Sequence, residues 1–390
     1  MKPFSRNMII IILFIYAITV PSCSNSFPIP AEISTQSIGS TNQLPSIHTT
    51  EAESAASPTT INVTDATRRN VSFNKIPERI VLVGKGVIML ADGVYLFPEA
   101  SDRLVAIGKT SQWKSDFVPI VDPKYADKTI LEIEAGPEQI AAMRPDLVLM
   151  KSSMAEKLGK SVEILDIPVI YLDLETPEQY PRDISILGEV FQNPGRAEEV
   201  NRFFEQRKQY VAQALSDLTE KDQPKVLLLY YSDKDGQLAF NVPPKGWMQT
   251  LVAHMAGGDP IWDDIELGNG WTKVNFEQIA SWDADYIFIV AYTNDAGEVV
   301  QSLKSDPQWQ ALRAVQDENL FPFPSDIYSW DQPDSRWILG LIWLASTLHP
   351  DKFPELDMKN EVIDFYSDLY GMDEITIQKV IMPSLEEDFK

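Results

Sequence analysis

The order of apolar and polar positions along the chain predicts strands and helices in alternation. Runs rich in β-branched residues, typical of strands buried on both faces, occupy residues 79–83, 104–107, 146–150, 168–172, 225–231 and 286–290. Helical spacing predicts helices near residues 87–95, 137–143, 247–255, 276–282 and 299–304. This alternation predicts an α/β fold with mostly parallel sheets, in which ligands bind beyond the carboxyl ends of the strands.

One short sequence occurs twice in the chain. Residues 138–141 and 277–280 both have the sequence Glu-Gln-Ile-Ala, and Asp146 or Asp285 follows each copy at the same offset and begins an apolar run. Each copy predicts a short helix, a turn and a buried strand. We therefore expect two similar, Rossmann-like lobes.

A single long helix is predicted between the two copies. The sequence Asn-Pro-Gly at residues 193–195 ends the preceding helix, and apolar residues then recur with helical spacing over residues 196–219. Such a helix is about 35 Å long. The expected organisation is an N-terminal lobe at residues 69–192, an interlobe helix at 193–222, and a C-terminal lobe at 223–390 that ends in closing helices. One stiff connecting helix favours small hinge motions.

The N-terminus predicts export and a lipid anchor. Lys2 and Arg6 precede an apolar run of about a dozen residues, which is shorter than the ~20 that span a bilayer. Residues 1–22 are therefore the expected signal peptide, and residues 20–23 (Val-Pro-Ser-Cys) resemble a lipobox that places the lipid on Cys23. Residues 23–68, rich in Ser, Thr and Pro, predict a flexible tether. This makes the protein extracytoplasmic and anchored to the membrane; an ordinary signal peptide with a chance cysteine is the alternative.

Composition and charge exclude several classes of function. Fifty-seven acidic against 33 basic residues give a formal charge of −24, which argues against nucleic acid as a partner. Cys23 is the only cysteine, so neither an intrachain disulfide nor a thiolate metal site is expected. The three histidines, His48, His254 and His349, are dispersed and predict no metal centre. The chain also lacks a G-x-S-x-G elbow and a P-loop, which counts against an enzyme.

The loops that follow the predicted strands contain aromatic residues and a few cations. Such residues suit a cleft for a bulky, partly anionic small molecule, which they bind by stacking and charge-assisted hydrogen bonds. For each residue, core packing or surface exposure is the alternative, and Trp337 and Trp343 are expected in the core. The candidate ligand-binding residues are Lys85, Trp113, Lys151, Ser153, Tyr231, Trp247, Tyr292, Tyr328, Trp330 and Arg336.

These features together resemble a known family. Residues 137–148 (Pro-Glu-Gln-Ile-Ala-Ala-Met-Arg-Pro-Asp-Leu-Val) and 276–280 (Phe-Glu-Gln-Ile-Ala) resemble the substrate-binding proteins of iron-complex ABC importers, which include siderophore, haem and cobalamin receptors. Residues 330–333 (Trp-Asp-Gln-Pro), with Arg336, are similar to a segment of members that take iron complexes, some of which take molybdate or tungstate instead. The resemblance extends from residue 69 to the C-terminus and implies the class III periplasmic-binding-protein fold.

The resemblance also implies partners and a docking mode. In that family one glutamate of each lobe docks onto arginines of the membrane permease, and the matching residues are Glu138 and Glu277. The alternative is that glutamate simply favours the first turn of a helix. The implied protein is a monomer without a cofactor that delivers an iron complex to an ABC permease and its ATPase. A molybdate or tungstate receptor and an extracytoplasmic enzyme on the same scaffold are the alternatives. Lys85 replaces a small polar residue of the family and favours an anionic ligand.

Overall fold

The structure is a computed structural model that describes residues 60–109, 116–233, 236–263 and 268–385. The chain divides into two compact units, Met1–Ala55 and Ala56–Lys390, and all described residues belong to the second. The signal peptide, Cys23, most of the expected tether and Trp113 lie outside the described residues. Among the residues described, no helix is both long enough and apolar enough to cross a membrane.

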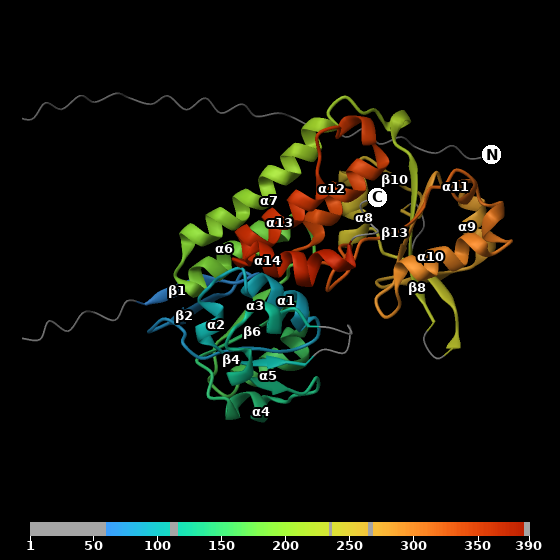
Figure 1. The fold of residues 1–390 in the computed structure, drawn as a ribbon. Coiled ribbons are helices and arrows are strands. Elements are labelled where there is room, and N and C mark those ends of the chain that lie inside the picture. Colours follow the sequence, from blue (N-terminus) through green and yellow to red (C-terminus); the bar gives the residue numbers. More distant parts are fainter. Residues whose placement is uncertain (1–59, 110–115, 234–235, 264–267, 386–390) are drawn as a thin grey trace, which may run out of the picture. The chain divides into compact units, whose positions relative to one another are not determined.

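The N-terminal lobe is built on a five-stranded parallel sheet (Figure 1). Its strand order is β5-β4-β3-β6-β7. The strands are β3 (Ile80–Leu82), β4 (Leu104–Gly108), β5 (Thr129–Leu131), β6 (Leu147–Lys151) and β7 (Val169–Leu172). The helices are α1 (Val87–Val94), α2 (Ala100–Arg103), α3 (Val118–Val121), α4 (Pro137–Ala142), α5 (Lys160–Glu163) and α6 (Gln179–Phe191). Strands β3, β6 and β7 are buried along their whole length, as continuous apolar runs predict.

The C-terminal lobe is built on a mixed sheet of order β11-β9-β8-β12-β13, with β10 also paired to β8. Strands β8, β12 and β13 are parallel, whereas β9 pairs antiparallel with both β8 and β11. The fold is therefore α/β with mostly parallel sheets, as the sequence predicts. The strands are β8 (Lys225–Ser232), β9 (Ala239–Val242), β10 (Asp259–Pro260), β11 (Thr272–Val274), β12 (Tyr286–Val290) and β13 (Leu320–Pro322). The helices are α8 (Met248–Met255), α9 (Phe276–Trp282), α10 (Ala296–Ser305) and α11 (Arg313–Gln316).

The long helix between the lobes is α7 (Pro194–Ala214). The side chain of Asn193 caps it by accepting a hydrogen bond from the backbone N–H of Arg196. It ends earlier than the helical spacing predicts, so its 21 residues span about 31 Å. Helix α7 packs on α6 and on α12 (Trp337–Leu348), where Phe204 stacks on Trp337 at 5.5 Å between ring centres. Trp337 and Trp343 are buried, as expected.

A β-hairpin precedes the first lobe strand. It consists of β1 (Ile61–Thr64) and β2 (Asn70–Phe73), and the carboxylate of Asp65 accepts hydrogen bonds in its turn from the backbone of Thr67 and Arg69. Ile61 and Val63 pack into the core of the lobe. The lobe therefore begins before residue 69, the boundary that the sequence predicts. The segment has a polar composition, but it contains a strand with one buried face.

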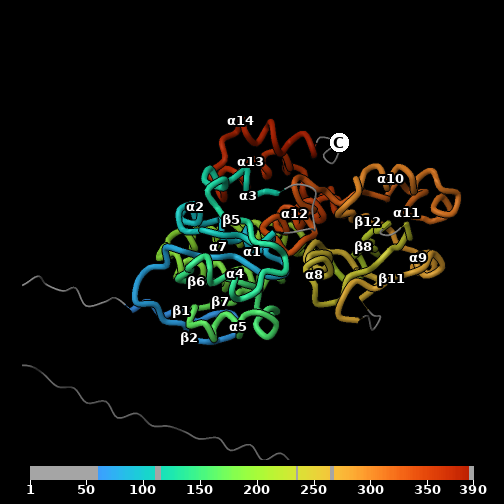
Figure 2. The backbone as a smooth tube through the Cα atoms, turned by 90° about the horizontal axis from the view of Figure 1, so that it is seen from below, coloured from blue at the N-terminus to red at the C-terminus, as the bar shows by residue number. Residues whose placement is uncertain are grey.

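The C-terminal helices pack against the N-terminal lobe and α7. They are α13 (Met358–Tyr370) and α14 (Glu374–Thr376), which Figures 1 and 2 show beside α3. Arg207 of α7 pairs with Glu361 at 2.9 Å, and the Tyr370 hydroxyl donates to the carbonyl oxygen of Asp92 at 3.1 Å. Residues 223–390 therefore include helices that contact the other lobe.

Candidate functional site

The strand-end loops of the N-terminal lobe bring three of the predicted ligand-binding residues, Lys85, Lys151 and Ser153, into one region. Lys85 lies between Gly84 and Gly86, whose positive φ angles of 102° and 76° form the turn from β3 into α1. Its side chain is exposed and forms no ion pair with another described residue. A Cβ at Gly84 would lie 3.0 Å from Cγ of Met154, so the loop after β6 packs against this turn. Ser153, also exposed, belongs to that second loop.

Lys151 has a different role from the predicted ligand contact. It is 2% exposed at the end of β6, and its Nζ donates to the carbonyl oxygens of Asp173 and Leu174. The Glu175 carboxylate lies 2.8 Å from the same nitrogen. Because the ammonium group is already surrounded by acceptors, Lys151 holds the end of β6 against the segment after β7 and is not free to bind a ligand.

Four aromatic side chains gather where β8 and β12 of the C-terminal lobe end. This aromatic cluster consists of Tyr230, Trp247, Trp271 and Tyr292. Tyr230 stacks on Tyr292 with ring centres 4.6 Å apart, and Trp271 lies 5.0 Å from Tyr230. Trp247 meets Trp271 edge to face at 5.7 Å. All four residues are half-buried.

The buried carboxylate of Asp331 contacts the aromatic cluster through Tyr292. Asp331 accepts a hydrogen bond from the Tyr292 hydroxyl at 2.7 Å and from Nε2 of Gln249 at 2.9 Å. Burial raises the pKa of Asp331 above its ordinary value. These bonds fix the ring of Tyr292 against Tyr230. Trp247 and Tyr292 are among the ligand-binding residues that the sequence predicts, whereas Tyr230 and Trp271 are not, although Tyr230 belongs to the same apolar run as Tyr231.

Tyr231 belongs to a second group on the other side of β8. Its ring meets Phe240 at 5.9 Å, and Phe240 lies 5.0 Å from Trp309. These rings line a pocket of about 610 Å3, here called the side pocket. The other lining residues are Leu238, Ala239, Lys273, Val274, Asn275, Phe276, Val299, Ser302, Leu303, Asp306 and Gln308.

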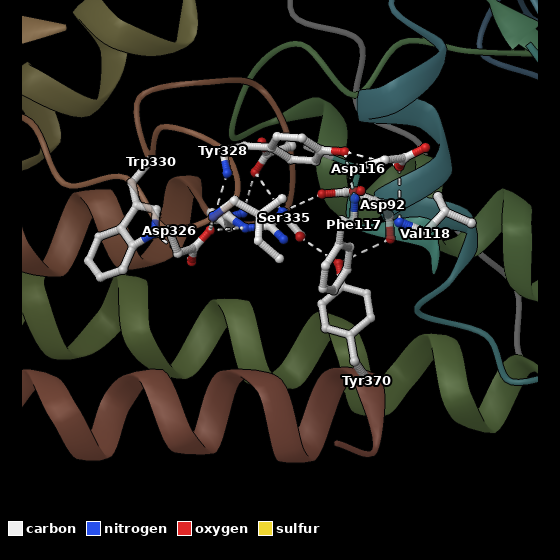
Figure 3. Close-up of polar contacts among 12 residues, drawn as sticks. Asp92, Asp116, Phe117, Val118, Asp326, Tyr328, Trp330, Ser335 and Tyr370 are labelled. Atoms are coloured by element: carbon white, nitrogen blue, oxygen red, sulfur yellow. Dashed lines mark hydrogen bonds and ion pairs between the residues drawn. The ribbon is translucent and has the colours of Figure 1, made fainter. Parts of the chain in front are cut away.

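Tyr328, Trp330 and Arg336 form part of a buried ion cluster between segments of the two lobes. Figure 3 shows Tyr328 and Trp330 in this cluster with Asp92 and Asp326. The Arg336 cluster consists of Arg336 with Asp92, Asp326, Asp334 and Tyr366. The Arg336 guanidinium pairs with Asp92 of α1, and its Nε lies 2.9 Å from both Oδ1 of Asp326 and the Tyr366 hydroxyl. Asp334 is 3.7 Å away.

Aromatic rings surround this guanidinium. Phe117 of the N-terminal lobe lies under it at 4.4 Å and Tyr328 at 4.9 Å, which are cation–π distances. The Tyr328 hydroxyl accepts from the Phe117 backbone N–H at 3.0 Å, and Trp330 donates to Asp326 at 3.0 Å. Arg336 and Trp330 are both 0% exposed. The predicted ligand contacts of Tyr328, Trp330 and Arg336 are therefore replaced by internal ones, and the three side chains join the lobes.

The Arg336 cluster has more carboxyl groups than cations. One guanidinium faces Asp92, Asp326 and Asp334, and Oδ1 of Asp92 and Nη2 of Arg336 have no hydrogen-bond partner among the described residues. Burial raises the pKa of Asp92 to about 7 although Arg336 opposes the rise, and burial also raises the pKa of Asp334. Both shifts favour the protonated, uncharged forms of these carboxyl groups.

The two repeated glutamates occupy equivalent places in the two lobes. Glu138 is the second residue of α4 and Glu277 the second residue of α9, and both side chains are exposed. Gly136 precedes the first helix, and Asn275 caps the second by accepting from the backbone of Gln278. Each carboxylate therefore stands in the first turn of a short helix, as the sequence predicts.

The described residues contain no cluster of three or more histidine, cysteine or acidic side chains able to hold a metal ion. His254 pairs with Asp263 at 2.9 Å, and His349 contacts the carbonyl oxygen of Gly257 at 3.1 Å.

Two α/β lobes joined by one long helix, with aromatic side chains at the strand ends, define a two-lobed binding protein.

Comparison with known proteins gives the family. Residues 94–327, more than half of the chain, match the periplasmic binding protein family. The chain therefore belongs to the periplasmic binding protein family; it is an extracytoplasmic solute-binding protein and not an enzyme. A curated relative, the molybdate-binding protein MolA of Haemophilus influenzae, is 22% identical over 254 residues, which cover 60% of this chain and 69% of the relative.

Solved structures share the fold. A periplasmic solute binding protein from Veillonella parvula superposes with a TM-score of 0.68 at 23% identity, over 84% of this chain and 98% of the other. MolA bound to molybdate gives 0.64 at 20% identity, over 80% and 98% of the two chains. CeuE of Helicobacter pylori with Ni(II) bound gives 0.62 at 16% identity, over 82% and 99%.

Proposed function

We propose that this protein is the substrate-binding component of an ABC importer and that it captures an iron complex of siderophore, haem or corrinoid type. The aromatic cluster supports this proposal most directly. Tyr230, Trp247, Trp271 and Tyr292 are four half-buried aromatic residues at the carboxyl ends of β8 and β12, where α/β sheets bind ligands. A metal chelate has flat organic surface that stacks on such rings, whereas a small oxyanion has none.

Lys85 adds a charge contribution from the other lobe. Its ammonium group is exposed at the carboxyl end of β3, the same kind of position that the aromatic cluster occupies on β8 and β12. A cation at this place favours a ligand with negative charge, such as a ferric chelate. The ligand class inferred from these residues is a bulky, anionic metal complex.

A fluorescence titration tests the ligand class. Ferric hydroxamate, ferric catecholate, haem, cyanocobalamin, molybdate and tungstate are added in turn to the purified protein. An iron complex that stacks on the aromatic cluster changes tryptophan emission, and Trp271→Phe weakens its binding. Trp282→Phe, in α9 and outside the cluster, is the matched control and leaves affinity unchanged. If none of these compounds changed the tryptophan emission, the result would contradict the receptor proposal.

A molybdate or tungstate receptor is the second candidate. The relative MolA, named as a molybdate-binding protein, favours it. An oxyanion binds through hydrogen-bond donors and cations, so its affinity depends on Lys85 and not on the rings. Tight molybdate binding that Lys85→Met abolishes and Trp271→Phe leaves intact would establish this candidate instead of the iron complex.

Docking to the permease is inferred for Glu138 and Glu277. Two exposed carboxylates on separate lobes suit two arginine sites of a two-fold permease. The double variant Glu138→Arg with Glu277→Arg is expected to lose uptake while ligand affinity stays intact. Glu198→Arg with Glu355→Arg, also at exposed positions but outside α4, α9 and the side pocket, is the matched control. Equal loss in the control would show a general charge effect and contradict specific docking.

Membrane attachment is inferred for Cys23. Thioether lipidation of this residue holds the mature protein on the membrane surface. Cells grown with radiolabelled palmitate are expected to label the wild-type protein, and Cys23→Ser is expected to remove both the label and the membrane association. Labelling that persists in Cys23→Ser would contradict this site.

A further inference from the structure

The side pocket lies next to one of the two inferred docking carboxylates. Its walls come from β8, β9, β11, α10 and the start of α9. Asn275 and Phe276 line it, and the next residue is the exposed Glu277. Tyr231, Phe240, Phe276 and Trp309 supply most of its aromatic surface. The exposed carboxylate therefore directly follows two lining residues of the pocket in the chain.

The sheet separates the side pocket from the aromatic cluster. Tyr230 and Tyr231 are successive residues of β8, so their side chains point to opposite faces of the sheet. Tyr230 stacks on Tyr292 in the aromatic cluster, whereas Tyr231 contacts Phe240 and lines the pocket. A ligand on the aromatic cluster therefore does not occupy the side pocket.

Two polar side chains of the pocket form hydrogen bonds within the protein. Oδ1 of Asn275 accepts from the backbone N–H of Gln278 at 2.8 Å, and Oδ1 of Asp306 accepts from the backbone N–H of Gln308 at 2.7 Å. Small-molecule sites need a few convergent polar groups that orient the ligand. Nine of the 14 lining residues are apolar or aromatic, which suits an apolar side chain of a protein partner.

Exposed apolar residues accompany both inferred docking carboxylates. Leu238 lines the side pocket and is 53% exposed. In the other lobe, Ile133 stands shortly before Glu138 and is 49% exposed. Protein interfaces combine apolar anchors in pockets with charged pairs at the rim. The acidic groups select a partner surface with cations next to apolar side chains.

We propose that the side pocket receives a bulky apolar side chain of the permease, next to the cation that pairs with Glu277. The inference rests on the docking role proposed for Glu277. It adds an apolar anchor, which gives affinity, to an ion pair, which gives orientation.

Filling the pocket tests this inference. Ser302→Trp places a large ring at an exposed lining position of α10, and Ser305→Trp makes the same change on the same helix outside the lining. Fluorescently labelled protein is titrated with nanodiscs that contain its cognate permease–ATPase complex. Ser302→Trp is expected to weaken nanodisc binding at least about tenfold, and Ser305→Trp less than about twofold. Affinity for the transported ligand stays unchanged in both.

Glu277→Arg separates the two hypotheses. If Glu277→Arg weakens nanodisc binding and Ser302→Trp does not, the pocket inference is overturned and docking stands. If neither variant weakens binding, docking through this lobe is itself refuted. Loss of ligand affinity in Ser302→Trp would assign the pocket to the ligand site and also overturn the inference.

A rim variant covers the case in which Ser302→Trp does not fold. Leu238→Ser removes apolar surface from the pocket without adding volume, and Ile164→Ser does the same at a position that is 80% exposed and outside the lining. Leu238→Ser is expected to weaken nanodisc binding about threefold while Ile164→Ser has no effect. Equal binding of the two variants contradicts the inference.

Discussion

Replacement of Asp92 by asparagine tests whether the Arg336 cluster holds a proton in the folded protein. The carboxyl of Asp92 faces Arg336, Asp116 and Asp326, and its pKa rises to about 7 because burial disfavours its charged form. In the unfolded chain its pKa is about 3.9. Between these values the folded protein binds a proton that the unfolded chain does not. The free energy of unfolding therefore falls as pH rises, by up to about 1.4 kcal/mol per pH unit, and this contribution ends above the folded pKa.

The Asp92→Asn variant lacks this slope, because a side-chain amide does not titrate. The stability advantage of the wild type over Asp92→Asn is expected to shrink by roughly 2–3 kcal/mol between about pH 5 and pH 7. Urea unfolding at several pH values measures both free energies. Because the pKa of Asp334 is also raised and the two carboxyls titrate together, Asp334→Asn is measured in parallel. Stability differences that stay constant with pH in both variants would refute the proton-holding cluster.

Three further changes test the packing that positions the candidate site. Arg336→Met leaves buried carboxylates without their cation. Urea unfolding at neutral pH is expected to show a free energy of unfolding that is lower by about 3–5 kcal/mol. A loss below about 1 kcal/mol contradicts the buried pairing. Gly340→Ala places a Cβ against the carbonyl oxygen of Trp330 and is expected to cost about 1–3 kcal/mol, whereas Gly246→Ala, in open space, is neutral. Tyr292→Phe removes a hydrogen-bond donor to Asp331 and is expected to lower the free energy of unfolding by about 1–3 kcal/mol. It is also expected to weaken ligand binding in the fluorescence titration. Unchanged affinity would show that Tyr292 is not part of the ligand site.

Much of the fold could be predicted because buried parallel strands are continuous apolar runs. Strands β3, β6 and β7 show this signal directly, and the repeated Glu-Gln-Ile-Ala sequence indicated the two lobes. Strand β1 was missed because only alternate residues are apolar and polar residues surround them. The last turns predicted for α7 are absent, since helical spacing continued beyond the residues that fold as helix.

The candidate site could be predicted only in part. The rule that ligands bind beyond strand ends points to the segment of Tyr230 and Tyr231, but the sequence does not tell which of the two neighbouring residues faces the aromatic cluster. The sequence predicts a ligand contact for Arg336 because it is a cation close to a turn among aromatic residues. Its partner Asp92 lies 244 positions away along the chain, and no local pattern indicates such a contact.

The alternation of side chains along β8 has a consequence for how this protein can diversify. Tyr230 faces the rings proposed to select the ligand, and Tyr231 faces the pocket proposed to engage the permease. Substitutions around Tyr230 can therefore change the nutrient that is taken up while the transporter contact remains intact. We expect such receptors to acquire new cargo by mutation on one face of this strand, and to exchange transporters by mutation on the other.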